Sequence, residues 1–265
     1  MIGWHRDGDS WTRRALVLGM AWAALTVAPA TLDAQGRRGG GRQPEFADNV
    51  PYDGRLTFAR IRYTMPDFGG FRGRDLPWSH DYPRGERHFT KIVSEITSAR
   101  VRTMQSNILT LDDPQLGKYP IAYMAEAGFW VPNEAETLGM RHYLTKGGFM
   151  VFDDFAGDAW RNFEAQMRKV LPDLRPIELT VDHPIFDSFY RIKSLDYYHP
   201  YYRMKSVFYG YFEGNDPKKR MLAIVNYNND LSEYWEFSDQ GMFPLDMSNE
   251  SYKLGVNYIV YALTR

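Results

Sequence analysis

The chain has 265 residues, of which 44% are apolar and 25% are charged, as in ordinary soluble globular proteins. Its formal net charge is −1, which argues against a protein that binds nucleic acid through bulk positive charge. Because the sequence contains no cysteine, disulfides, thiolate metal sites and cysteine nucleophiles are excluded.

Residues 1–34 have the pattern of a secretory signal peptide. Arg13 and Arg14 precede an apolar run over residues 15–30, which is shorter than the roughly 20 residues of a membrane-spanning helix and is interrupted by Pro29. The arginine pair resembles a twin-arginine export signal. We therefore expect an exported protein, periplasmic or secreted, with no membrane span after cleavage. Retention by an uncleaved N-terminal anchor is the alternative.

Residues 35–45 follow as a basic, glycine-rich segment that we interpret as a flexible linker. An arm that binds an anionic lipid or polymer is the alternative reading of its arginines. The remaining residues, 46–265, are predicted to form a single α/β domain.

Hydrophobic spacing predicts alternating strands and helices in the first part of this domain. In chain order, the predicted elements are a strand at 56–63, a helix over 89–96, a short strand at 100–104, a strand at 121–124, a helix from 133 to 146, a strand at 149–152 and a helix over 160–170. Asn133 and Glu136 have the spacing of a capping box at a helix start. This alternation predicts a mostly parallel sheet with helices on both faces.

The pattern changes in the C-terminal part of the chain. Two strand-like runs, at 206–212 and 221–227, are joined by a turn segment at 214–217, which predicts an antiparallel extension of the sheet. The last element, 252–263, is apolar nearly all round and is expected to be a buried helix.

Several strings in the sequence are similar to one known family. They are WSHDYPRGE at 78–86, YLTKGGF at 143–149, Asp153-Asp154, HPIF at 183–186 and LGVNY at 254–258. Together they resemble the bacterial domain-of-unknown-function family 4159, over about 56–264. The resemblance implies a flavodoxin-like sandwich of the class I glutamine amidotransferase-like type. It also implies work in the cell envelope.

The comparison with glutamine amidotransferases is informative because the nucleophile is missing. In those enzymes a strand leads into a tight turn that presents a cysteine. In this chain Asp153 and Asp154 stand after the corresponding strand. Glutamine amide transfer through a thioester is therefore excluded.

Acidic side chains follow two of the predicted parallel strands. Glu126 comes after the strand at 121–124, and Asp153 and Asp154 come after the strand at 149–152. Ligands of open α/β sheets bind outside the carboxyl ends of strands. These carboxylates can share a proton or hold a hard divalent cation. The structural alternative is that Asp154 or Asp158 caps the next helix while the other acids face water.

A polar and aromatic loop and one later histidine complete the candidate site residues. Trp78, His80, Asp81 and Tyr82 are predicted to form a ligand-binding surface beside the strand ends, although Trp78 can instead pack to hold the loop. His183 precedes a proline, and we interpret it either as a proton carrier for Asp153 or Asp154 or as a turn residue.

A tyrosine-rich segment offers a different kind of surface. It contains the tyrosines 197, 198, 201, 202, 209 and 211. Exposed aromatic rings bind sugars and protein partners, whereas alternate tyrosines of a strand pack into the core. Tyr209 and Tyr211 share one face of the predicted strand, which favours packing for these two.

The preferred functional hypothesis is a non-catalytic envelope module that binds a small polar ligand or an envelope protein. No cofactor is identified, although the carboxylates admit a divalent cation. A hydrolase that uses Asp153 or Asp154 with His183 is one alternative. Carbohydrate or cell-wall binding through the tyrosines is the other.

Overall fold

One mixed β-sheet organises the structure, a computed structural model that describes residues 46–66 and 76–265. The predicted signal peptide and linker lie outside these residues. Within the described part, the strands are β1 (Ala59–Ile61), β2 (Asn107–Leu109), β3 (Ile121–Ala125), β4 (Phe149–Phe155), β5 (Ile177–Glu178), β6 (Val207–Phe212) and β7 (Met221–Tyr227). The helices are α1 (Arg84–Ile96), α2 (Glu134–Thr145), α3 (Ala159–Val170), α4 (Leu231–Glu236) and α5 (Leu245–Thr264).

The strand order in the sheet is β2-β1-β3-β4-β7-β6-β5. Neighbouring strands from β2 to β7 run parallel, and β6 and β5 are antiparallel to their neighbours. The predicted α/β class and the antiparallel extension are therefore confirmed. The chain order reverses between β1 and β3, and in doubly wound sheets ligands bind beside the carboxyl ends of the strands at such a reversal.

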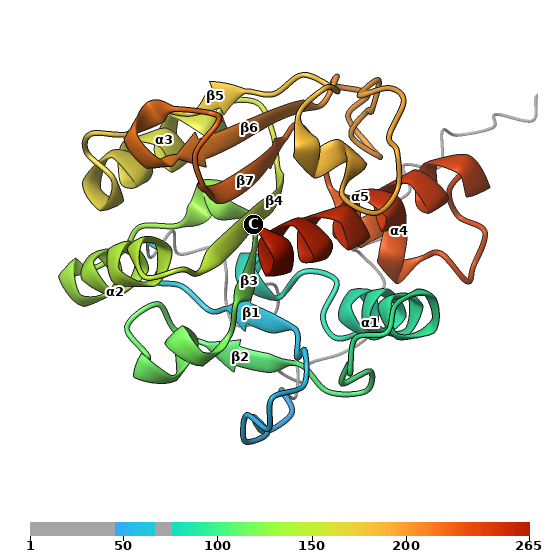
Figure 1. Cartoon of the computed structure of the whole chain (residues 1–265), viewed down its shortest axis with the longest axis horizontal. Helices are drawn as coiled ribbons and strands as arrows, with labels where there is room; N and C mark the ends of the chain where they lie inside the picture. The colour runs from blue at the N-terminus through green and yellow to red at the C-terminus, as the bar shows by residue number, and fades with distance from the viewer. Residues whose placement is uncertain (1–45, 67–75) are drawn as a thin grey trace, which may run out of the picture. The chain divides into compact units, whose positions relative to one another are not determined.

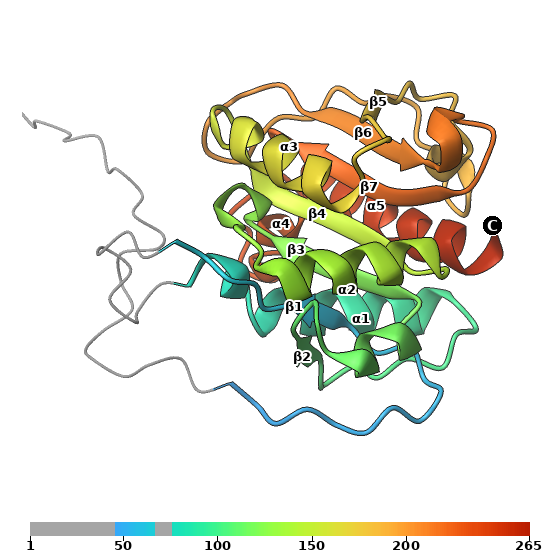
Figure 2. The same cartoon turned by 90° about the vertical axis from the view of Figure 1, so that its left-hand side faces the viewer.

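Helices cover both faces of the sheet, as Figures 1 and 2 show. Side chains alternate along each strand, so one strand supplies two cores. In β3, Ala122 and Met124 face the core that holds α2 and α3, whereas Tyr123 and Ala125 face the core that holds α1, α4 and α5. The result is a three-layer α/β/α sandwich.

A β-bulge shapes the carboxyl end of β4. Phe152 pairs with Val225 and Phe155 pairs with Tyr227, so β4 has one residue more than β7 over this stretch. Asp154 lies inside the bulge with a φ of 58°. Bulges turn side chains away from the regular alternation. This local irregularity gives Asp153 and Asp154 different surroundings, although they are neighbours in the chain.

Local sequence signals predicted the start of α2 correctly, whereas weaker signals gave wrong or missing elements in other segments. The capping box of Asn133 and Glu136 is present at the start of α2. The predicted strand at 100–104 was wrong, because only Val101 makes a bridge, to Leu56, and the paired strand is β2. The very short elements β5 and α4 were not predicted. Within 46–66 and 76–265, no helix combines the length and apolar composition needed to cross a membrane.

Candidate functional site

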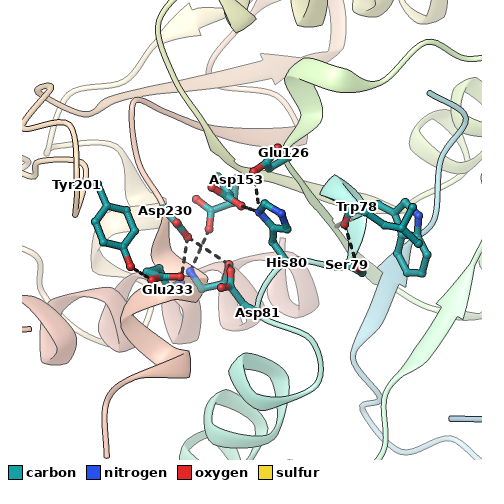
Figure 3. Close-up of polar contacts among 12 residues, drawn as sticks. Trp78, Ser79, His80, Asp81, Glu126, Asp153, Tyr201, Asp230 and Glu233 are labelled. Carbon is teal, nitrogen blue, oxygen red and sulfur yellow. Dashed lines mark hydrogen bonds and ion pairs between the residues drawn. The ribbon is translucent and has the colours of Figure 1, made fainter. Parts of the chain in front are cut away.

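Segments that are far apart in the sequence meet at the carboxyl edge of the parallel strands (Figure 3). The loop after β1 brings His80 and Asp81, and the residue after β3 is Glu126. The bulge of β4 contributes Asp154, and the turn between β7 and α4 contributes Asp230. The structure thus brings together several of the polar residues that the sequence singled out.

His80, Glu126 and Asp154 form the partly exposed portion of this cluster. The Nδ1 atom of His80 lies 2.6 Å from Oε1 of Glu126 and 3.5 Å from Oδ2 of Asp154. One nitrogen and two carboxylate ligand atoms lie within 4.8 Å of one another, a grouping that can hold a metal ion. Their side chains are 14%, 16% and 10% exposed, so solvent reaches all three.

Backbone conformation contributes to the placement of these side chains. Asp81, Glu126 and Asp154 have φ values of 63°, 44° and 58°, in the left-handed region that residues other than glycine rarely adopt. At Glu126 the surrounding structure supports this backbone, because the Tyr63 hydroxyl donates a hydrogen bond to the Glu126 carbonyl oxygen at 2.7 Å. Backbone strain of this kind clusters at functional sites.

A buried ion pair holds the loop that carries His80. Arg60 of β1 is fully buried, and its Nε lies 2.5 Å from Oε1 of Glu86 in α1. Its Nη1 also donates to the carbonyl oxygen of Trp78 at 3.0 Å. The Trp78 ring is buried against Phe46, with 4.8 Å between the ring centroids. Trp78 therefore packs and fixes the loop, which is the alternative that the sequence offered for this residue.

Tyr82 also supports the loop from outside the cluster. Its hydroxyl accepts a hydrogen bond from the Ala47 backbone N–H at 3.1 Å, and its ring contacts Phe46. Of the loop residues proposed to bind a ligand, the structure places His80 and Asp81 in the polar cluster, and Trp78 and Tyr82 beneath or beside it.

Asp153 is fully buried and connects three elements. Its Oδ2 accepts hydrogen bonds from the Tyr123 hydroxyl at 2.8 Å and from the Leu231 N–H at 2.9 Å, and its Oδ1 accepts one from the Asn226 amide at 3.1 Å. Burial raises the pKa of Asp153 to about 6, and these hydrogen bonds act in the opposite direction. Asp153 therefore joins β3, β7 and the start of α4.

His199 reaches the cluster from the loop before β6. A ligand atom of its ring lies within 4.8 Å of carboxylate oxygens of Asp154 and Asp230. Its Nδ1 accepts from the backbone N–H groups of Tyr201 and Tyr202, at 3.2 and 3.4 Å. The neutral ring consequently carries its proton on Nε2. Burial lowers the pKa of His199 to about 4. At neutral pH the ring is therefore uncharged and donates a hydrogen bond through Nε2.

Further carboxyl groups lie behind Asp81. Asp81 accepts a short hydrogen bond from the Ser232 hydroxyl, and the Tyr201 hydroxyl donates one to Glu233. Burial, followed by the proximity of Asp81, raises the pKa of Glu233 to about 10. Figure 3 shows Tyr201 pointing at Glu233 from the side of the cluster away from His80.

Carboxyl groups are concentrated at this edge of the sheet. Burial raises the pKa of Asp154 well above its usual value, and the neighbouring Glu126 raises it further. Burial and the charge of Asp154 do the same to Asp230. Among the described residues, no lysine or arginine makes an ion pair with Asp154, Asp230 or Glu233. Such a site favours protons or a cation.

His183 lies at the other end of the sheet. Its ring contacts Phe212, which pairs with Met221 at the start of β7, whereas Asp153 bonds to Asn226, five residues further along. At about 3.3 Å per strand residue, the two side chains are separated by roughly 16 Å. His183 caps a short turn through its Nδ1, so the reading as a turn residue is right and its pairing with Asp153 or Asp154 was wrong.

The tyrosines do not form one continuous surface. Tyr197 and Tyr211 are buried, and Tyr209 packs on Trp160 with 4.8 Å between ring centroids. Tyr198 and Tyr202 are exposed on the loop that carries His199. The shared face of Tyr209 and Tyr211 packs on the core of α2 and α3, as expected.

Three residues of the cluster were missed at the level of sequence. Asp230 directly follows the polar pair after β7, and the carboxyl end of that predicted strand was an available signal. His199 and Glu233 had no comparable signal, because the first lies in a loop and the second in a helix of six residues. The capping role considered for Asp154 is wrong, since the start of α3 has no side-chain cap.

A comparison with curated protein sequences gave no match. A family model described as "Domain of unknown function (DUF4159)" matches residues 57–263, which include every residue of the cluster. Most of the chain is covered by this match, and the matched stretch contains the whole sheet. The chain therefore belongs to the family of domains of unknown function 4159.

Proposed function

We propose that this chain is an exported cell-envelope module that binds a divalent cation and, through the cation, a small polar ligand. The observation that carries the proposal is the grouping of His80, Glu126 and Asp154. They come from three separate segments, present ligand atoms to one another, and remain partly exposed. Three protein ligands at a partly exposed position leave room for a further ligand on the cation.

Electrostatics support a cation at this position. The pKa of Asp154 is raised by burial and then by the charge of Glu126, so a further negative charge at this position is unfavourable. A divalent cation removes that repulsion. The mixed nitrogen and oxygen ligands suit Mn²⁺ or Zn²⁺ better than Mg²⁺ or Ca²⁺, which prefer oxygen alone. Because protons compete for Asp154, cation affinity should fall as the pH is lowered.

Titration calorimetry of the chelator-treated full chain with Mn²⁺, Zn²⁺, Mg²⁺ and Ca²⁺ tests this proposal. We expect one cation per chain, bound most tightly for Mn²⁺ or Zn²⁺. Asp154→Asn and Glu126→Gln should each lower the affinity at least tenfold. His183→Gln is the matched control, because it removes a histidine at the opposite end of the sheet. Equal affinities of wild type and Asp154→Asn would rule out the site.

A second function, cation-assisted hydrolysis, is favoured by the contact between His80 and Glu126. A carboxylate at 2.6 Å from the imidazole is the arrangement that orients a histidine for proton transfer. In this version the cation would be held by Glu126 and Asp154 and would activate a water as the nucleophile. His80 would carry the proton instead of binding the cation, which is the role that the sequence had suggested for His183. Recovery of ligand cleavage products, lost in His80→Gln, would select hydrolysis over simple binding.

Export is supported by the arginine pair and the short apolar run near the N-terminus. Mass spectrometry of the protein isolated from its producing cells tests this part separately. We expect a mature chain that starts close to residue 35. A protein that retains residues before the apolar run would contradict cleavage and would favour the anchor.

A further inference from the structure

The loop that carries His199 presents two exposed aromatic rings next to the polar cluster. Tyr198 is 48% exposed and Tyr202 is 67% exposed. The ring of Tyr202 lies 4.4 Å from the ring of His199, measured between centroids. Since His199 is within reach of Asp154 and Asp230, the two tyrosines lie at the border of the site.

Several contacts hold this loop in place. The His199 backbone N–H donates to the Met204 carbonyl oxygen at 2.9 Å, and the Tyr234 hydroxyl donates to the Tyr198 carbonyl oxygen at 3.2 Å. The hydroxyl of Tyr201 donates to Glu233 of α4. The loop therefore buries His199 and ties the hydroxyl of the partly exposed Tyr201 to α4, while Tyr198 and Tyr202 are the most exposed of its rings. A surface ordered in this way loses little conformational entropy when it binds a ligand.

The charges of the cluster restrict what can lie on this surface. Carboxylate oxygens of Asp154 and Asp230 lie within 4.8 Å of a ring atom of His199, on which Tyr202 packs. Carboxyl groups repel an anionic ligand and accept hydrogen bonds from hydroxyl groups. The Nε2–H of His199 supplies a donor. The Nδ2 group of Asn229, next to Asp230, is fully buried and has no acceptor among the described residues. Such a donor calls for an oxygen from a bound molecule or water.

We propose that the ligand of this site is a neutral saccharide whose ring packs on Tyr202 and Tyr198. Its hydroxyl groups would donate to Asp230, accept from His199 and coordinate the cation held by His80, Glu126 and Asp154. A saccharide fits both parts of this surface. The apolar face of its ring can pack on the tyrosines, and its hydroxyl groups can donate hydrogen bonds to the carboxylates. This inference rests on the proposed function, because the saccharide shares the cation site.

Calorimetric titration of the full chain with neutral tetrasaccharides of glucose, mannose, xylose and N-acetylglucosamine tests the inference. Each titration is made with and without Mn²⁺, and tetragalacturonate is the anionic comparison. We expect at least one neutral tetrasaccharide to bind and the anionic one to bind at least tenfold more weakly. Tyr202→Ala should lower saccharide affinity about tenfold and leave Mn²⁺ affinity unchanged.

Tyr52→Ala is the matched control, because Tyr52 is 40% exposed and borders a different hollow, lined by Lys118 and Gly147. It should leave saccharide affinity unchanged. Mn²⁺ binding without any neutral saccharide binding would overturn this inference and leave the proposed function intact. Saccharide binding that Tyr202→Ala does not weaken would also overturn it. Saccharide binding without Mn²⁺ binding would refute the cation site and retain the tyrosine surface.

Discussion

Asp153 and Asp154 are adjacent in the chain, and their side chains have different roles. Asp153 is enclosed and receives hydrogen bonds from side chains and from the backbone at the start of α4. Asp154 keeps 10% of its side chain exposed, and its neighbours are other members of the polar cluster. The first carboxylate therefore stabilises the fold, and the second is destabilised by its surroundings. This contrast predicts opposite effects of substitution.

Asp153→Ala should lower the free energy of unfolding by about 3 kcal/mol, because it leaves the buried donors of Leu231 and Asn226 without this acceptor and removes one hydrogen bond of Tyr123. Urea unfolding followed by circular dichroism measures the change. Asp112→Ala is the control, since Asp112 is exposed and a change within about 0.5 kcal/mol is expected. A similar loss in both variants would refute the role given to Asp153.

Asp154→Asn should raise the free energy of unfolding by about 1 kcal/mol at pH 8 in the presence of a chelator. Because the pKa of Asp154 is raised in the folded state, the unfolded chain ionises first, and this residue costs folding stability as the pH rises above the usual pKa of an aspartate. Once the pH is below the usual pKa of an aspartate, both states are protonated and the gain should disappear. Urea titrations of both proteins at several pH values measure it. A less stable variant at pH 8 would contradict the prediction.

His183 should make the protein lose stability on acidification. Burial lowers its pKa in the folded state, and its Nδ1 accepts a hydrogen bond from the Ile185 N–H at 3.3 Å. The unfolded chain therefore binds the proton first, so stability is full above about pH 6.5 and falls as the pH drops toward the folded pKa. Between pH 7 and 5, wild type should lose more unfolding free energy than His183→Gln. Parallel losses would exclude this contribution.

At the scale of elements, the site depends on how strands end. The bulge of β4 adds a residue, and the turn after β7 leads directly into α4, whose first backbone N–H groups bond to Asp153 and Asp230. Helix starts offer unpaired N–H groups, so burying carboxylates there satisfies both partners. The cluster is thus part of the connection between sheet and helix.

Helix α2 packs closely against the chain that follows β2, and a substitution in the helix can test this packing. A Cβ added to Gly139 would lie 2.0 Å from the carbonyl oxygen of Leu111, which is backbone and yields little. Gly139→Ala should therefore destabilise the protein by about 2 kcal/mol, against the usual gain of alanine in a helix. Gly117→Ala, with nothing within 4 Å, is the control. Thermal unfolding of both variants measures the change in stability. A Gly139→Ala variant that is more stable than the wild type would contradict this packing.

At the scale of the whole molecule, cation binding joins segments that are otherwise distant in sequence. A cation held by His80, Glu126 and Asp154 binds only the folded chain, so it should stabilise it. At a free concentration of 100 times the dissociation constant the expected gain is about 2.7 kcal/mol. This corresponds to a rise in melting temperature of roughly 5–10 °C for a domain of this size. With at least tenfold weaker binding, Asp154→Asn should show no more than about half of this rise, and an equal rise in both proteins would indicate binding elsewhere.

Local sequence was sufficient for the main elements of this protein and for part of its site. Periodic apolar residues, the capping box at Asn133 and the glycines after α2 are signals read within a few residues of one another. Glu126 and Asp154 could also be predicted as site residues, because they follow strands that apolar patterns predict. The loop residue His80 was selected by its polar and aromatic neighbours.

Only the tertiary structure decided which histidines and which further acids meet these carboxylates. His183 has the residue type of a proton carrier but lies at the opposite end of the sheet from Asp154. His199 and Asp230 complete the cluster instead. Strand order, the bulge at Asp154 and the packing of the loop around His199 determine that outcome. These depend on contacts between segments up to 151 residues apart, and no pattern of neighbouring residues encodes them.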